Sequence, residues 1–139
     1  MTEVARVRTT AVPDIPGASW SNCLKIGREV VVSGITARGS DGLPVGGDSV
    51  EGQARACFDK LFAQLNAAGG HPGNVYKLVI YTTRIDKKDE VNAARKGAFK
   101  GTYPASTFVG STGFVFPDLM VEIDAWTNLD IDLSALEDA

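Results

Sequence analysis

Apolar residues recur along the chain at two spacings, and the spacing separates the expected helices from the expected strands. Between residues 48 and 68 they fall on one stripe at intervals of three and four, which predicts an amphipathic helix. Asp48 and Glu51 resemble a capping box at its start. The glycine pair at 69–70 is expected to end it.

Alternating positions and β-branched runs predict six strands. They cover residues 4–10, 23–26, 29–33 and 75–83, with two more inside 104–128. The last two are expected to form a hairpin joined by a short turn that contains proline. A second, more polar helix is expected over 87–100, with Asp86 as its candidate N-cap.

The expected order is β, β-β, α, β, α, β-β, which predicts an α+β fold with two helices on one face of a mixed sheet. A chain of 139 residues suits one domain, 1–139. Apolar residues occur on both faces of strands 29–33 and 75–83. Because large apolar patches are rarely left in water, we expect the uncovered faces to pack together in a homo-oligomer.

One strand inside 104–128 carries two carboxylates on the same side. Alternation places Glu122 and Asp124 on one face, together with Met120 and Trp126. Two interpretations remain open, and both carboxylates stay candidate site residues. The face is either exposed or part of an interface ion pair, or one carboxylate works as an acid or base in a cleft.

Composition and charge exclude several classes of function. The formal net charge is -3 and the 14 basic residues are scattered, so nothing indicates nucleic-acid binding. The N-terminal segment lacks the apolar core of a signal peptide, and no apolar run approaches transmembrane length. We therefore expect a soluble, cytoplasmic protein.

The cysteines and the histidine do not form a metal site. Only Cys23, Cys57 and His71 are available, too few for the four ligands of structural zinc. We expect two buried free thiols, with a disulfide as the alternative. The glycine-rich loop at 39–47 lacks the known phosphate-binding motifs and is expected to lie on the surface.

Four segments resemble those of the RidA/YjgF family in order and spacing: WSNCLKIGREVVVSGITA, QARACFDKLFAQLNAAGG, VYKLVIYTT followed by DEVN, and PASTFVGSTGFVFPDLMVEIDAW. The resemblance covers about residues 16–127 and leaves an acidic tail at 128–139. It implies a chorismate-mutase-like α+β fold, a homotrimer, and small-molecule clefts between neighbouring subunits. For the family's active branch it implies hydrolysis of reactive enamines and imines such as 2-aminoacrylate. That reaction releases ammonia and a 2-keto acid without a metal or organic cofactor.

The resemblance also implies which residues form the site. Glu122 matches the glutamate that orients or activates water, and Asn92 matches the asparagine of the family's V-N motif. Gly34, preceded by Ser33, matches the glycine that lines the cleft. Trp20 stands in the place of a tyrosine that closes the pocket in active members.

One position departs from the family pattern. Active members carry P-A-R, whose arginine binds the substrate carboxylate, whereas this chain has Ser106 at the arginine position. An arginine forms two parallel charge-assisted bonds with a carboxylate, and a serine hydroxyl offers one neutral donor. Arg38 is a candidate replacement, while Arg95 is expected to be a surface residue.

Two hypotheses follow for function. The first is a hydrolase that acts on an enamine or imine other than 2-aminoacrylate, with Glu122 activating water. The second is a non-catalytic trimer that binds a small molecule or a protein, in a chaperone-like or translation-inhibitor-like role. The absence of the P-A-R arginine is the feature that favours the second hypothesis.

Overall fold

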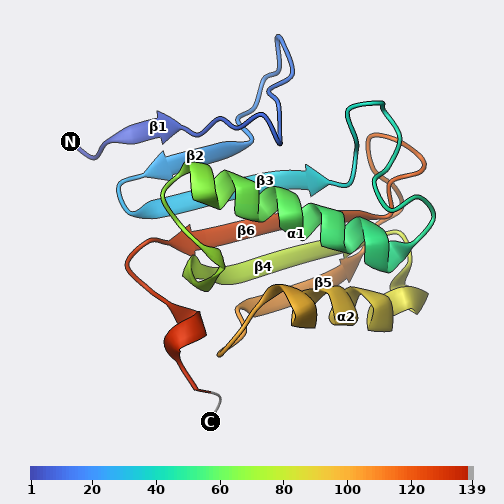
Figure 1. Cartoon of the computed structure of the whole chain (residues 1–139). Coiled ribbons are helices and arrows are strands. Elements are labelled where there is room, and N and C mark those ends of the chain that lie inside the picture. The colour runs from blue at the N-terminus through green and yellow to red at the C-terminus, as the bar shows by residue number, and fades with distance from the viewer. Residues whose placement is uncertain (138–139) are drawn as a thin grey trace.

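The structure, a computed structural model, describes residues 1–137 and contains six strands and two α-helices (Figure 1). The strands are β1 (Val4–Arg6), β2 (Cys23–Ile26), β3 (Glu29–Thr36), β4 (Val75–Thr82), β5 (Ala105–Gly110) and β6 (Val121–Asn128). The helices are α1 (Val50–Ala67) and α2 (Lys88–Ala98). Short 3₁₀ turns cover η1 (Pro72–Asn74), η2 (Ile85–Lys87) and η3 (Leu133–Ala135). Residues 138 and 139 of the predicted acidic tail lie outside the described residues.

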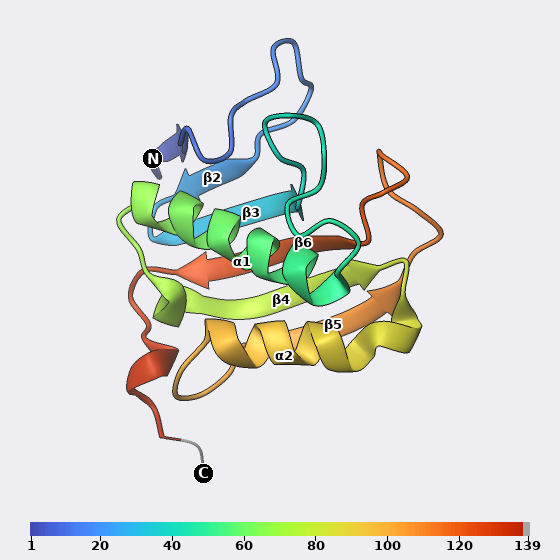
Figure 2. The ribbon, with the colours of Figure 1, turned by 45° about the vertical axis from the view of Figure 1, so that its right-hand side comes forward.

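The six strands form one mixed sheet in the order β1-β2-β3-β6-β4-β5. Among the neighbouring strands of the described residues, β4 and β5 are parallel and the other pairs are antiparallel. Both α-helices lie on the same face of the sheet, as two views of the ribbon show (Figures 1 and 2). The prediction of a single α+β domain with two helices on one face of a mixed sheet is confirmed.

The predicted hairpin between the last two strands is wrong. β4 lies between them, bonded to β5 on one side and to β6 on the other. Parallel strands need a long crossover, and α2 provides it between β4 and β5. The chain then returns through residues 111–120, so that β6 enters the middle of the sheet and β5 stays at the edge.

The ends of the helices correct two further predictions. α1 is capped by Ser49, whose Oγ accepts the backbone N–H of Gly52 at 2.9 Å, and not by Asp48. Serine is among the best N-cap residues because its oxygen satisfies a free N–H of the first turn. Asp86 lies in η2, where it bonds to Arg84, and therefore does not cap α2.

The glycine pair ends α1 as predicted. Gly69 has φ of +87°, and the backbone N–H of Gly70 bonds to the carbonyl of Leu65 at 2.8 Å. These are features of the Schellman motif, in which a left-handed residue reverses the chain and satisfies the last carbonyls of the helix. The reversal leads directly into η1 and β4.

The core lies between the two helices and the sheet. Cys23 and Cys57 are both buried there as free thiols, as predicted. Burial raises the pKa of Cys23 to about 11 and that of Cys57 to about 12, so both thiols stay protonated at neutral pH. The largest fully buried side chains of the core are Phe58, Leu61, Leu65, Leu78, Ile80, Leu119 and Ile123.

Candidate functional site

The two carboxylates of β6 lie on the face of the sheet that the helices do not cover, here called the open face. Val121, Ile123 and Ala125 are buried in the core, and the alternate residues Glu122 and Asp124 are half-buried on the other side. The predicted alternation is therefore confirmed. It places both carboxylates between β3 and β4, where side chains of neighbouring strands can contact them.

Asp124 is held on both of its carboxylate oxygens. Oδ1 accepts the backbone N–H of Gly34 at 2.9 Å, and Oδ2 accepts the hydroxyl of Tyr81 at 3.2 Å. The first bond depends on a bulge in β3 between Val32 and Ile35. Gly34 has φ of +69° in this bulge, a conformation that glycine adopts without steric cost. The Asp124 side chain is therefore held in one position.

Glu122 is the freer of the two carboxylates. Its neighbours across the sheet are Thr36 on β3 and Tyr81 on β4. Burial, followed by repulsion from Asp124, raises the pKa of Glu122 above its ordinary value. Both effects disfavour the charged form, so the carboxylate is a stronger proton acceptor than an exposed glutamate.

Asn22, just before β2, accepts a hydrogen bond from each of two predicted site residues, Trp20 and Ser33. Ser33 donates its backbone N–H to the carbonyl of Asn22 at 3.2 Å. Trp20 donates its indole N–H to Oδ1 of Asn22 at 3.1 Å, and 52% of the residue is exposed. Trp20 is therefore linked through Asn22 to Ser33, which precedes Gly34, the residue that bonds to Asp124. We name five residues the open-face group: Trp20, Ser33, Gly34, Glu122 and Asp124.

Three other residues meet at the edge of the sheet, where α2 lies over β5. Arg95 donates from Nη1 to Oγ of Ser106 at 2.9 Å and from Nη2 to Oδ1 of Asn92 at 3.2 Å. We name Asn92, Arg95 and Ser106 the helix-edge group. With Lys96, Tyr103 and Pro104 they line a cavity of about 350 Å³.

Arg95 is the residue that sequence reasoning missed. It was expected on the surface, but it is half-buried and contacts both site residues predicted at this edge, Asn92 and Ser106. One signal in the sequence is informative. Asn92 and Arg95 are three residues apart, a spacing that places them on the same side of a helix.

The two groups do not meet within one chain. Ser106 pairs with Leu78, whose side chain is buried beneath the helices, whereas Glu122 pairs with Tyr81 on the open face. Paired residues share a face, so Ser106 and Glu122 lie on opposite faces. The width of β4 also separates them, which places their strands roughly 10 Å apart.

Arg38, predicted as a candidate replacement for the arginine absent at position 106, lies against Phe116. Its guanidinium carbon lies 4.0 Å from the centre of the Phe116 ring, a cation–π arrangement. Its carbonyl accepts the ammonium of Lys60 at 2.7 Å, which fixes the backbone after β3. The arginine that contacts Ser106 is Arg95 instead.

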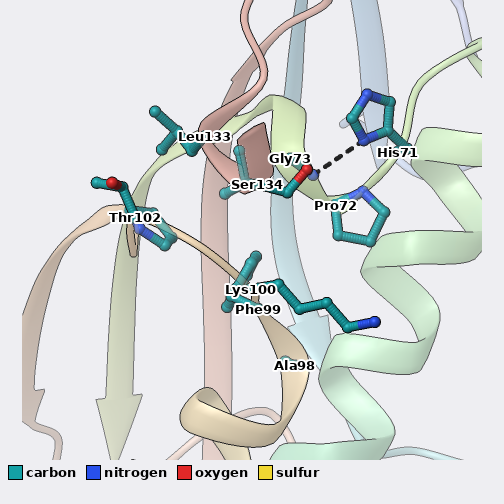
Figure 3. Close-up of a pocket in the computed structure, with 11 residues that line it drawn as sticks. His71, Pro72, Gly73, Ala98, Phe99, Lys100, Thr102, Leu133 and Ser134 are labelled. Atoms are coloured by element: carbon teal, nitrogen blue, oxygen red, sulfur yellow. Dashed lines mark hydrogen bonds between the residues drawn. The ribbon is translucent and has the colours of Figure 1, made fainter. Parts of the chain in front are cut away.

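A second cavity, of about 250 Å³, contains none of the predicted site residues (Figure 3). It lies between η1, the end of α2 and the segment around η3, and His71 is at its rim. Nδ1 of His71 accepts the backbone N–H of Gly73 at 3.1 Å and so caps η1. Within residues 1–137, no three His, Cys, Asp or Glu side chains are grouped closely enough to hold a metal ion.

The six-stranded mixed sheet, its two helices and the carboxylates on its open face define a small α+β protein of the YjgF fold. The family model described as Endoribonuclease L-PSP matches residues 12–128, and the chain belongs to this family, the YjgF/RidA family. No protein in a search of curated sequences matches the chain. None of the helices in the described range has the length and apolar character needed to cross a bilayer.

Several solved structures are similar to this chain. A protein of unknown function from Pseudomonas aeruginosa is 49% identical, with a TM-score of 0.89 over 99% of this chain and 100% of its own. A member of the YjgF/YER057c/UK114 family from Mycobacterium tuberculosis is 26% identical, with a TM-score of 0.75 over 91% and 99%. A Rid-family protein of unknown function from Yersinia pestis is 25% identical, with a TM-score of 0.82 over 91% and 99%.

Proposed function

We propose that this protein is a Rid-family hydrolase that acts on a reactive enamine or imine metabolite other than 2-aminoacrylate. Glu122 activates the attacking water in this proposal. The observation that carries it is the half-buried Glu122, whose pKa is raised by burial and by Asp124. Catalytic bases are commonly tuned in this direction, because proton transfer is most efficient when the pKa approaches the working pH.

The reaction proceeds in three steps. The enamine first tautomerises to the imine by moving a proton from nitrogen to carbon. Water then attacks the imine carbon while Glu122 accepts one of its protons, and the imine nitrogen takes up a proton. The carbinolamine collapses as its hydroxyl loses a proton and the nitrogen, protonated again, leaves as ammonia. The product is a carbonyl compound, and no metal or organic cofactor takes part.

Asp124 has a separate part in this proposal. Because Gly34 and Tyr81 hold its two oxygens, Asp124 stays in place while Glu122 exchanges protons. Its fixed charge favours the protonated form of Glu122 and stabilises positive charge on the imine nitrogen. In this proposal the substrate also contacts Ser33, which lies in the same bulge, and Trp20, which is linked to Ser33 through Asn22.

The proposal includes a homotrimer in the cytoplasm, with the ligand bound between neighbouring subunits. Two observations support it. The open-face group and the helix-edge group lie on opposite faces, so a second copy is needed to bring both to one ligand. The open face also carries Val31, Val79 and Val109, and Val109 is 38% exposed. Covering these side chains would favour assembly.

Ser106 favours the alternative, a non-catalytic trimer that binds a small metabolite or a protein partner. At the position where active members carry an arginine, this chain has a hydroxyl that accepts a bond from Arg95. A ligand that raises the melting temperature without being converted would support binding over catalysis. The charge distribution gives no reason to include nucleic acid among the partners.

The test generates imines from a panel of amino acids with an amino-acid oxidase and follows their loss by trapping with semicarbazide. The parent protein should accelerate loss of at least one imine, and Glu122→Gln should reduce this rate by about 10²- to 10⁴-fold. Glu3→Gln is the matched control, because Glu3 is exposed and lies outside both groups. Equal rates for the parent and Glu122→Gln would show that Glu122 is not the base.

A further inference from the structure

Arg95 differs from the other six arginines of the chain. Five of them form ion pairs with carboxylates: Arg6, Arg8, Arg28, Arg55 and Arg84. Arg38 lies against the ring of Phe116. Among residues 1–137, Arg95 has neither an ion-pair partner nor an aromatic one, although it is half-buried.

Two neutral groups hold the guanidinium in position. Ser106 and Asn92 each accept one of its N–H groups, which leaves three of the five donors of Arg95 for other partners. The two acceptors keep donors of their own. The hydroxyl hydrogen of Ser106 and the amide N–H₂ of Asn92 remain available beside the guanidinium. Within residues 1–137, this arrangement is rich in donors and contains no carboxylate partner.

The charges around the cavity also favour an anionic ligand. Lys96 also lines it, next to Arg95, so two cations border a space of about 350 Å³. A guanidinium is planar and binds a carboxylate through two parallel bonds. A half-buried guanidinium gains most from such a partner because it has already lost part of its hydration. Tyr103 and Pro104 complete the lining with apolar and aromatic surface.

We propose that Arg95, positioned by Asn92 and Ser106, binds the carboxylate of a 2-imino acid substrate and thereby replaces the arginine missing from the P-A-R position. This inference rests on the proposed function, whose substrate class it narrows. The guanidinium is supplied by α2 instead of β5, and it reaches the hydroxyl of Ser106 from the helix side. Tyr103 and Pro104 favour imino acids with large apolar side chains.

The first test measures binding without catalysis. Phenylpyruvate, a 2-oxo acid product of such a reaction, is titrated into the whole protein by calorimetry, with phenylpyruvamide as the uncharged probe. Arg95→Gln should weaken binding of the acid by about 10- to 100-fold, as expected for a lost charge-assisted pair, and leave the amide unchanged. Arg84→Gln is the control, since Arg84 is an exposed arginine paired with Asp86.

Two results of this titration would overturn the inference. Equal affinity of Arg95→Gln and the parent for the acid overturns the inference, as does an acid that fails to bind the parent at its solubility limit. Should Arg95→Gln not fold, as judged by circular dichroism, Arg95→Lys takes its place. This variant keeps the charge and loses the two-bond geometry, so it should weaken acid binding and spare the amide.

The inference and the proposed function fail separately. Arg95-dependent binding of phenylpyruvate without hydrolysis of any imine would refute the hydrolase and leave the carboxylate site standing. Hydrolysis whose KM for an imino acid is unchanged in Arg95→Gln would refute the carboxylate site and leave the hydrolase standing. With both correct, Arg95→Gln raises KM for the imino acid more than it lowers kcat.

Discussion

The open-face group and the helix-edge group divide the chemistry of this chain between two faces of one sheet. The open-face group is anionic, with Glu122 and Asp124 side by side on β6. The helix-edge group is cationic, with Arg95 beside two neutral acceptors. The first suits proton transfer and the second suits binding of an anion. Their separation indicates that neither group alone makes a site for an imino acid.

Rigidity also differs between the two groups. Asp124 is fixed by a backbone N–H inside a β-bulge, so its position follows from the sheet itself. Within residues 1–137, the half-buried Arg95 is held by two side chains, those of Asn92 and Ser106. Both residues lie on regular elements, but the position of the Arg95 guanidinium depends on the rotamers of Arg95, Asn92 and Ser106, whereas one bond to Asp124 comes from the backbone. We expect substitutions in the open-face group to change rates and substitutions in the helix-edge group to change affinity.

The largest expected effect tests whether the two groups act separately. Glu122→Gln should reduce imine hydrolysis by about 10²- to 10⁴-fold because it removes the proton acceptor. The same variant should bind phenylpyruvate as the parent does, since the proposed carboxylate site contains Arg95 and not Glu122. Calorimetry beside the trapping assay measures both. Loss of acid binding in Glu122→Gln would contradict the division of roles.

A second prediction concerns the bulge that holds Asp124. Gly34→Ala should lower the free energy of unfolding by about 1–2 kcal/mol, because a side chain is strained at φ of +69°. Space is not the cause, since a Cβ at Gly34 would meet no atom within 4 Å. Gly113→Ala is the matched control, with the same open space and no positive φ. Urea unfolding of the two variants measures the difference.

The alternation of β6 could be predicted from the sequence, whereas its partners could not. Side chains of a strand alternate with a period of two, so the positions of Glu122 and Asp124 follow from local pattern. The partner strands depend on contacts between distant segments. Residues 104–128 contain no information that β4 enters between β5 and β6. The short turn predicted that β5 and β6 pair as a hairpin. In the structure, β5 pairs with β4 instead, and α2 is the crossover that connects these two parallel strands.

The contacts of Arg95 could likewise not be predicted from the local sequence. Spacing places Asn92 and Arg95 on one side of α2, but it does not say which strand that side covers. Ser106 becomes their neighbour only because β5 runs parallel to β4 beneath the helix. A resemblance compares residues position by position, so it shows that position 106 is not an arginine but cannot show that Arg95 of α2 contacts that position.

A third prediction concerns the acceptors that position Arg95. Ser106→Ala removes one of two bonds that hold the guanidinium, so binding of phenylpyruvate should weaken by about 3- to 10-fold. The effect should be smaller than that of Arg95→Gln, since the charge remains. Ser106→Thr, which keeps the hydroxyl, should restore most of the affinity. An equal loss in Ser106→Ala and Ser106→Thr would indicate that the hydroxyl has no positioning role.

The smallest expected effect is the pH dependence of stability. Burial and Asp124 raise the pKa of Glu122 in the folded chain, so the folded state binds its proton more tightly than the unfolded state does. The contribution of Glu122 to stability is therefore complete below the ordinary glutamate pKa and is lost as pH rises through the raised value. Glu122→Gln has no such titration. Its free energy of unfolding should increase relative to the parent over this window, as measured by urea unfolding at a series of pH values.

The pH series also separates the two faces. Arg95→Gln changes a residue of the helix-edge group, on the opposite face from Glu122, so the difference between this variant and the parent should not follow the pH window of Glu122. A pH-independent difference between Glu122→Gln and the parent would mean that Glu122 is as well hydrated in the folded chain as in the unfolded one. The open face would then lack the desolvated base on which the hydrolase depends, and the carboxylate-binding edge would remain as the chain's functional site.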